Sequence, residues 1–187
     1  MSPTTEELAI TLSLRNIIEH EGYRARIYLD TKGHRTGGFG SKRPASCPYR
    51  ERDTVGLYWS LAWLSEAFVE AIEASKRIFT TTEFSTAGSV RWAAIIELCY
   101  WMGEAGLRDG FPRFCVAFRE KRWLAAGLEL IYDTPETSGA ERYEDEIWEP
   151  VGSHGAWVNQ GEPTQLWQDT PTRTRTLADM IATGREG

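Results

Sequence analysis

The 187-residue chain lacks several features that mark specialised protein classes. Its three cysteines, Cys47, Cys99 and Cys115, are too few and too widely spaced for a disulfide framework or a Cys-x-x-Cys metal site. We expect reduced thiols, with Cys99 and Cys115 in the core, and no metal or other cofactor. No apolar run reaches the roughly 18 residues that would span a membrane. The first residues also lack the basic and apolar regions of a signal peptide.

Positive charge is scarce as well, because 21 Lys and Arg stand against 27 Asp and Glu, which gives a net charge of −6. Nucleic acid is therefore not an expected partner, since phosphate binding needs a basic surface. The rest of the composition, 41% hydrophobic and 26% charged, is that of an ordinary globular protein. The length suits one well-cored domain, and nothing in the sequence calls for more than a monomer.

Helical and strand-like patterns together predict an α+β fold. Thr4 and Glu7 form a capping box before an amphipathic helix that ends near Gly22. A hairpin is predicted over 26–40, followed by a loop over 41–56. Further helices are predicted over 57–79, 89–102, 111–132 and 172–183, with a break over 80–88. The 89–102 helix is apolar on nearly every side, so we expect it to be central and buried.

Residues 133–165 differ in composition from the rest of the chain. They contain eight acidic residues and one basic residue, Arg142, together with three prolines. Trp148 and Trp157 argue against simple disorder. We therefore interpret the segment as an acidic insertion that is ordered or partly ordered.

Three polar residues around the predicted hairpin form a candidate active site. Glu21 ends the first helix, Asp30 follows nine positions later before the hairpin turn, and Thr36 lies on the return strand. Apolar and aromatic neighbours would keep Glu21 protonated, whereas basic neighbours would favour an ionised Asp30. Thr36 could hold a water. Two carboxyl groups and a hydroxyl around one cleft can hydrolyse a glycosidic bond, although each residue alone is a common surface or capping residue.

The sequence around these residues strongly resembles the active-site motif of the T-even phage lysozymes, glycoside hydrolase family 24. The family pattern is Glu-Gly, then Tyr-x-Asp, then Gly-x-x-Thr-x-Gly-x-Gly. It is matched without a gap by Glu21-Gly22, Tyr28-Leu29-Asp30 and 33–40. The resemblance continues in order over about 20–183, with landmarks at 91–106, 121–123 and 170–173, and with the acidic segment as an extra insertion. Ser41 and His34 depart from the usual family residues, as does the acidic net charge.

The resemblance implies a lysozyme-like fold for a single domain over 1–187. A hairpin lobe (22–56) would be joined by a connecting helix (57–79) to a larger helical lobe (1–21 and 80–187). Glu21 would be the general acid, Asp30 the second carboxylate and Thr36 the residue that positions water. Glu104 would orient the cleft or pair with a basic residue. The residues expected to bind substrate are Gly40, Lys42, Tyr100, Trp101 and Phe114.

By the same resemblance, the chain would be a bacteriophage endolysin, a muramidase that hydrolyses peptidoglycan, with inversion, for host cell lysis. It would gather in the host cytoplasm and reach the cell wall through a holin pore. Two alternatives remain open. One is a lytic transglycosylase, which uses one catalytic Glu, and the other is a catalytically quiet wall-binding or virion-assembly module. A virion-borne lysozyme would have the same sequence features as an endolysin.

Overall fold

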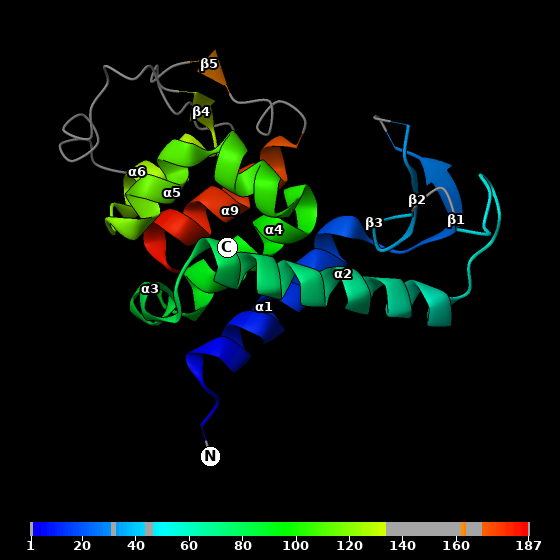
Figure 1. Cartoon of the computed structure of the whole chain (residues 1–187), viewed down its shortest axis with the longest axis horizontal. Helices are drawn as coiled ribbons and strands as arrows, with labels where there is room; N and C mark the ends of the chain where they lie inside the picture. Colours follow the sequence, from blue (N-terminus) through cyan, green and yellow to red (C-terminus); the bar gives the residue numbers. More distant parts are fainter. Residues whose placement is uncertain (1, 31–32, 44–46, 134–161, 164–169, 187) are drawn as a thin grey trace.

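The computed structural model describes residues 2–30, 33–43, 47–133, 162–163 and 170–186 (Figure 1). This part of the chain contains seven helices, a small three-stranded antiparallel sheet and a pair of two-residue strands. The protein is therefore mostly helical and belongs to the α+β class, as predicted. In Figure 1 the sheet lies at one end of the long helix α2 (Leu57–Ile78), and most of the other helices gather around its opposite end.

Helix α1 (Thr5–Glu21) has the capping box that the sequence predicts. The Thr4 backbone N–H donates to the Glu7 carboxylate at 2.7 Å, and the Glu7 N–H donates to the Thr4 hydroxyl at 3.1 Å. At the other end the chain leaves the helix through Gly22, whose φ of 61° suits glycine. Glu21 is thus the last helical residue, fixed where the chain turns into the sheet.

The sheet is built from β1 (Arg24–Leu29), β2 (Arg35–Gly38) and β3 (Ser41–Lys42), in that order. The predicted hairpin is confirmed, and Thr36 lies opposite Tyr28 on one side and Lys42 on the other. Strand β3 falls in the segment predicted to be a loop. A strand of two residues is too short to show the alternating pattern on which such predictions depend.

Two glycines allow strand β2 to pack closely against its neighbours. A Cβ added to Gly37 would lie 2.6 Å from Cδ1 of Ile27, and one added to Gly38 would lie 2.9 Å from Cβ of Ser60 in helix α2. Gly38 also has a φ of +63°. The glycine-rich return strand therefore lies directly on the start of α2, which fixes the sheet relative to that helix.

The segment over 80–88 was wrongly predicted to be a break. It forms helix α3 (Thr81–Ala87), capped by reciprocal hydrogen bonds between Thr80 and Glu83 and ended by Gly88. The Thr-x-x-Glu capping box was visible in the sequence. Phe84 anchors this short helix, since its side chain is fully buried and stacks on Trp92 with ring centroids 4.4 Å apart.

Helix α4 (Ser89–Gly110) is the central, buried helix that the sequence predicts, with no exposure at Ile95, Ile96 or Leu98. It extends beyond the predicted end because a second helical stretch follows a kink at Gly103, where φ is 77°. Gly103 thus ends the buried stretch of α4, but a helical stretch continues beyond it. The seven residues after it turn toward the rim of the cleft described below.

The predicted helix over 111–132 is two helices, α5 (Pro112–Arg119) and α6 (Trp123–Glu129). The chain breaks between them at Lys121, which has a φ of 62°, a conformation that cannot continue a right-handed helix. Helix α9 (Pro171–Thr183) agrees with the predicted last helix and ends at Gly184. Gly127 lets α6 and α9 approach closely, because a Cβ there would lie 2.7 Å from the carbonyl oxygen of Ala178.

The two ends of the predicted acidic insertion meet in space. Strand β4 (Tyr132–Asp133) pairs antiparallel with β5 (Glu162–Pro163). Trp148 and Trp157 lie outside the described residues.

The predicted core position of Cys99 and Cys115 is confirmed, as both side chains are 3% exposed and carry free thiols. None of the helices in the described part of the chain combines the length and apolar character that a membrane crossing requires.

Candidate active site

A cleft of about 1930 Å³ lies where the sheet, the end of α1 and the helices α2, α4 and α9 meet. The three residues predicted to be catalytic all line it, although they come from three different local structures. Four of the five predicted substrate-binding residues line it as well. The wall residues discussed below are Glu21, Asp30, Thr36, Gly40, Lys42, Tyr100, Trp101 and Arg173.

Glu21 is held at the base of this cleft by two contacts. Its Oε1 lies 2.6 Å from Nη1 of Arg173 in an ion pair whose side chains are 19% and 11% exposed. Its carboxyl group also lies against the backbone of Gly40, where an added Cβ would come within 2.6 Å of the Glu21 Cδ atom. The partial burial expected from the sequence is present, but the ion pair with Arg173 was not anticipated.

Asp30 follows strand β1 directly and organises the hairpin turn. Its Oδ1 accepts a hydrogen bond from the His34 backbone N–H at 2.8 Å, and its Oδ2 lies 3.3 Å from His34 Nδ1. The same carboxylate reaches the cleft, with one fifth of the side chain exposed. Asp30 therefore combines a structural role in the turn with a position on the cleft wall.

Thr36 is nearly buried, with 3% exposure, at the back of the cleft. Its hydroxyl donates to the carbonyl oxygen of His34 at 3.2 Å. A hydroxyl oxygen has two lone pairs, so Thr36 can still accept a hydrogen bond from a water in the cleft. The direction of its own proton is thereby fixed, which favours one orientation for such a water.

Arg173 connects Glu21 to a second, deeper carboxylate that sequence reasoning missed. Its Nε donates to Oε1 of Glu97 at 3.1 Å, and Nδ1 of His20 lies 2.6 Å from that same oxygen. The guanidinium also lies over the ring of Trp101, 4.4 Å from its centroid. Glu97, a Glu within an apolar helical run, was an available signal of this network, because a fully buried charge needs partners.

Tyr100 joins the helices to the sheet, because its hydroxyl donates to the carbonyl oxygen of Phe39 at 2.6 Å. Burial raises the pKa of Tyr100, and the negative charge of Glu21 acts in the same direction. Tyr100 and Trp101 both line the cleft and are partly exposed, and Gly40 and Lys42 line it as well.

Phe114 is the exception among the predicted substrate-binding residues. Its side chain has no exposure and packs in the helical core, with its ring 6.0 Å from that of Phe118. The assignment of Phe114 to the substrate site was therefore wrong. Its position in helix α5, on the face turned toward the other helices, makes it a core residue.

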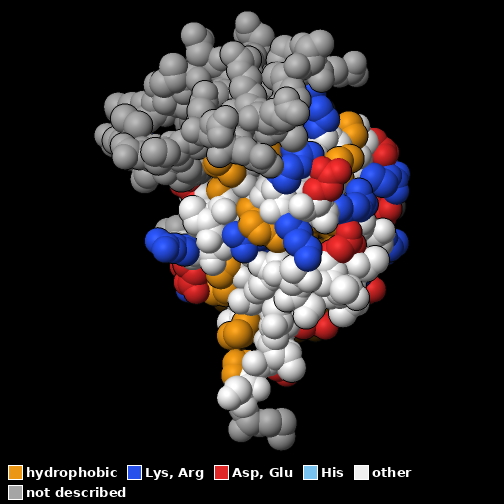
Figure 2. All heavy atoms as spheres, turned by 90° about the vertical axis from the view of Figure 1, so that its left-hand side faces the viewer, with side chains coloured by type: hydrophobic (Ala, Val, Ile, Leu, Met, Phe, Trp, Pro, Cys, Tyr) orange, Lys and Arg blue, Asp and Glu red, His pale blue; other side chains and the backbone are white. Residues whose placement is uncertain are grey.

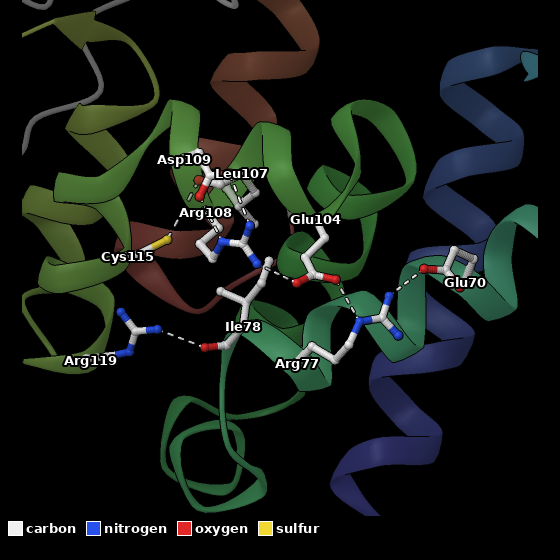
Figure 3. A network of polar contacts seen from close by, with 9 residues as sticks. All are labelled: Glu70, Arg77, Ile78, Glu104, Leu107, Arg108, Asp109, Cys115 and Arg119. Atoms are coloured by element: carbon white, nitrogen blue, oxygen red, sulfur yellow. Dashed lines mark hydrogen bonds and ion pairs between the residues drawn. The ribbon is translucent and has the colours of Figure 1, made fainter.

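One rim of the cleft carries a chain of ion pairs between α2 and the helical stretch after Gly103 (Figure 3). Arg77 Nε pairs with Glu104 at 2.6 Å, and Arg108 Nη1 pairs with the other Glu104 oxygen at 2.7 Å. Glu70 also pairs with Arg77. The expectation that Glu104 would pair with a basic residue is confirmed. These groups are largely exposed, so they orient the rim more than they stabilise the fold.

Charges of both signs are also mixed on one face of the described structure. Figure 2 shows Lys and Arg side chains beside Asp and Glu side chains on the described part of one face, so neither sign dominates there. Within the described ranges there is no group of three or more His, Cys, Asp or Glu residues arranged to hold a metal ion.

Comparisons with known proteins add no family assignment. No protein-family model matches the chain, and no curated protein is significantly similar to it.

Proposed function

We propose that this protein is a lysozyme of the T-even phage type, which hydrolyses the β-1,4 bond between N-acetylmuramic acid and N-acetylglucosamine in peptidoglycan. One observation carries the proposal. Glu21, Asp30 and Thr36, the polar positions of the sequence motif, line a single cleft. The motif was identified in the sequence from its resemblance to the family pattern, and a cleft between the sheet and the helices at the same three residues supports the proposal.

In this proposal Glu21 protonates the leaving oxygen of the glycosidic bond. Asp30, ionised, activates a water that Thr36 holds on the opposite side of the sugar ring. An inverting reaction of this kind needs room for the water, which means carboxyl groups about 6.5–9.5 Å apart. The exposed faces of Tyr100 and Trp101 offer apolar surface against which sugar rings can lie.

The proposal extends to the biological setting that the sequence resemblance implies. The sheet and the helices around α2 would be the two lobes of a lysozyme-like fold, with the polymer in the cleft between them. The protein would act as a monomeric endolysin that reaches peptidoglycan through a holin pore at the end of infection.

The decisive test replaces the proposed acid. Glu21→Gln keeps the size of the side chain and a hydrogen-bond acceptor for Arg173 but cannot donate the required proton. We expect it to lower the rate of turbidity loss of bacterial cell walls by at least about 10²-fold, within the range attributed to general acid catalysis. The matched control is Glu51→Gln, which makes the same change at an exposed position outside the cleft wall and should keep full activity. A fully active Glu21→Gln variant would rule out the assignment.

Product analysis separates the alternatives. Digestion in H₂¹⁸O followed by mass spectrometry of the muropeptides should show reducing ends that carry one ¹⁸O. Anhydro sugars without ¹⁸O would identify a lytic transglycosylase. Binding to walls with no released product would identify a catalytically quiet module. Proton NMR of the first products should show the α-anomer, and a β-anomer would exclude inversion.

A further inference from the structure

Glu97 is the most deeply buried charged residue in the described structure, with no exposed surface, and it does not line the cleft. One of its oxygens, Oε1, receives both His20 Nδ1 at 2.6 Å and Arg173 Nε at 3.1 Å. An ionised carboxylate can only accept hydrogen bonds, so the tautomer of His20 with its proton on Nδ1 would donate to Glu97. Glu97 thus contacts both His20, the residue next to Glu21, and Arg173, the ion-pair partner of Glu21.

Arg173 lies between two carboxylates that differ sharply in environment. Nη1 is paired with the partly exposed Glu21 at 2.6 Å, and Nε with the fully buried Glu97. Its guanidinium is also covered by the Trp101 ring. Among the described residues, the Glu97 Oε2 and Arg173 Nη2 atoms are buried without a hydrogen-bond partner.

This arrangement bears on a requirement of the proposed chemistry. A general acid must hold its proton, yet a neighbouring arginine favours the ionised form of a carboxyl group. If Arg173 had Glu21 as its only counter-ion, it would hold Glu21 ionised. Because Glu97 supplies a second negative charge to the same guanidinium, a proton on Glu21 leaves a neutral Arg173–Glu97 pair behind.

We propose that Glu97 is a positioning residue that balances the charge of Arg173, so that Glu21 can carry a proton while Arg173 still holds its carboxyl group in place. The inference rests on the proposed role of Glu21 as a general acid. It adds a function for a buried residue that never contacts substrate. His20 completes the network by fixing the same Glu97 oxygen.

The other titratable groups that face Glu21 do not replace this effect. Tyr28 from β1 and Tyr100 from α4 both have pKa values raised by burial and by the charge of Glu21, so their hydroxyls are neutral near pH 7. The charged residues Glu19, Arg24 and Asp30 also line the cleft, but they are unchanged in every variant used below.

The test compares the ionisation of Glu21 in matched variants. Carbon-13 NMR of protein labelled at the Glu carboxyl carbons would follow the titration, with the Glu21 signal assigned from its loss in Glu21→Gln. In Glu97→Gln, Arg173 loses its compensating charge. We expect the Glu21 titration, and the alkaline limb of the kcat/KM profile, to move to lower pH by about one unit, with little change in KM.

The double variant Glu97→Gln/Arg173→Gln removes both charges and tests the sign, even if Glu97→Gln alone does not fold. Here the closest charge on Glu21 is lost, so the titration should move to higher pH than in the native protein. Glu73→Gln, an exposed change on α2 outside the cleft wall, should leave it unchanged. The inference would be overturned if Glu73→Gln shifted the Glu21 titration as much as Glu97→Gln does, or if Glu97→Gln left that titration unchanged. A native protein without lytic activity would instead overturn the proposed function.

Discussion

Gly40 offers a direct test of whether the position of Glu21 matters, because alanine at this site would push on the carboxyl group. A Cβ on Gly40 would lie 2.6 Å from Cδ and 3.2 Å from Cγ of Glu21, whereas ordinary contact begins near 3.4 Å. Oε2 of Glu21 would be nearer still, so the carboxyl group would have to retreat by at least about 0.8 Å, the difference between 3.4 and 2.6 Å. A displacement of about 1 Å at a reacting group can cost about 10²-fold in rate.

The backbone adds a separate cost in stability. Gly40 has a φ of +71°, which a residue with a side chain adopts at a cost of about 1–3 kcal/mol. For a chain of this length that corresponds to a fall in Tm of about 2–12 °C. The steric cost itself should be small in stability, because Glu21 is the end of a flexible side chain. Activity should thus fall much further than stability explains.

Gly88→Ala is the matched control for Gly40→Ala. Gly88 has a φ of +83° but open space where a Cβ would be, and it lies outside the cleft wall. We expect a comparable loss of Tm by calorimetry and unchanged lysis of cell walls at 25 °C. If Gly40→Ala and Gly88→Ala retained equal activity, the placement of Glu21 against Gly40 would have no catalytic meaning.

Two further predictions concern Thr36 and the cysteines. Thr36→Val removes the hydroxyl that donates to His34 and should lower the free energy of unfolding by about 0.5–1.5 kcal/mol. The rate of cell-wall lysis should fall more than about tenfold, and Thr36→Ser should restore it. Equal activity of the Val and Ser variants would exclude a role of Thr36 in holding water. Burial raises the pKa of Cys99 to about 12 and of Cys115 to about 11, from 9.0. A thiol reagent at pH 8 should therefore modify Cys47 alone until denaturant is added. In the unfolded chain the thiols ionise at lower pH than in the folded protein. The stability that they contribute is therefore complete below about pH 9 and is lost as pH rises toward 12. If Cys99→Ala left the pH dependence of the free energy of unfolding unchanged over this range, the reasoning would be contradicted.

Much of the fold could be predicted from local patterns. The first and last helices are marked by the Thr4 capping box and by Pro171 with Gly184, and the buried helix α4 by its continuous apolar run. The predictions failed where a local signal was short or was overridden. Helix α3 has only seven residues, and the helix predicted over 111–132 was divided by a left-handed Lys121, a conformation that no residue type in that stretch announces.

The candidate site was predictable to the extent that its polar residues lie close together in the sequence. Glu21, Asp30 and Thr36 are close in sequence, so their spacing and the glycines between them indicated one cleft. Phe114 was misassigned because the sequence does not distinguish an aromatic ring that faces the cleft from one that faces the core. The orientation of this ring is determined by the packing of α5 against its neighbours.

The Arg173 network could not have been predicted in this way, because it joins residues that the chain separates widely. The hydrogen bond between Arg173 and Glu21 spans 152 positions, and that between Arg173 and Glu97 spans 76. Such contacts exist only once α1, α4 and α9 have packed. A local motif can therefore name candidate catalytic residues, whereas the charged residues that contact them come from distant parts of the sequence. Under the proposed function, the charges that bear on the protonation of Glu21 in this acidic protein are local, one buried Glu and one Arg, and do not follow from its net charge.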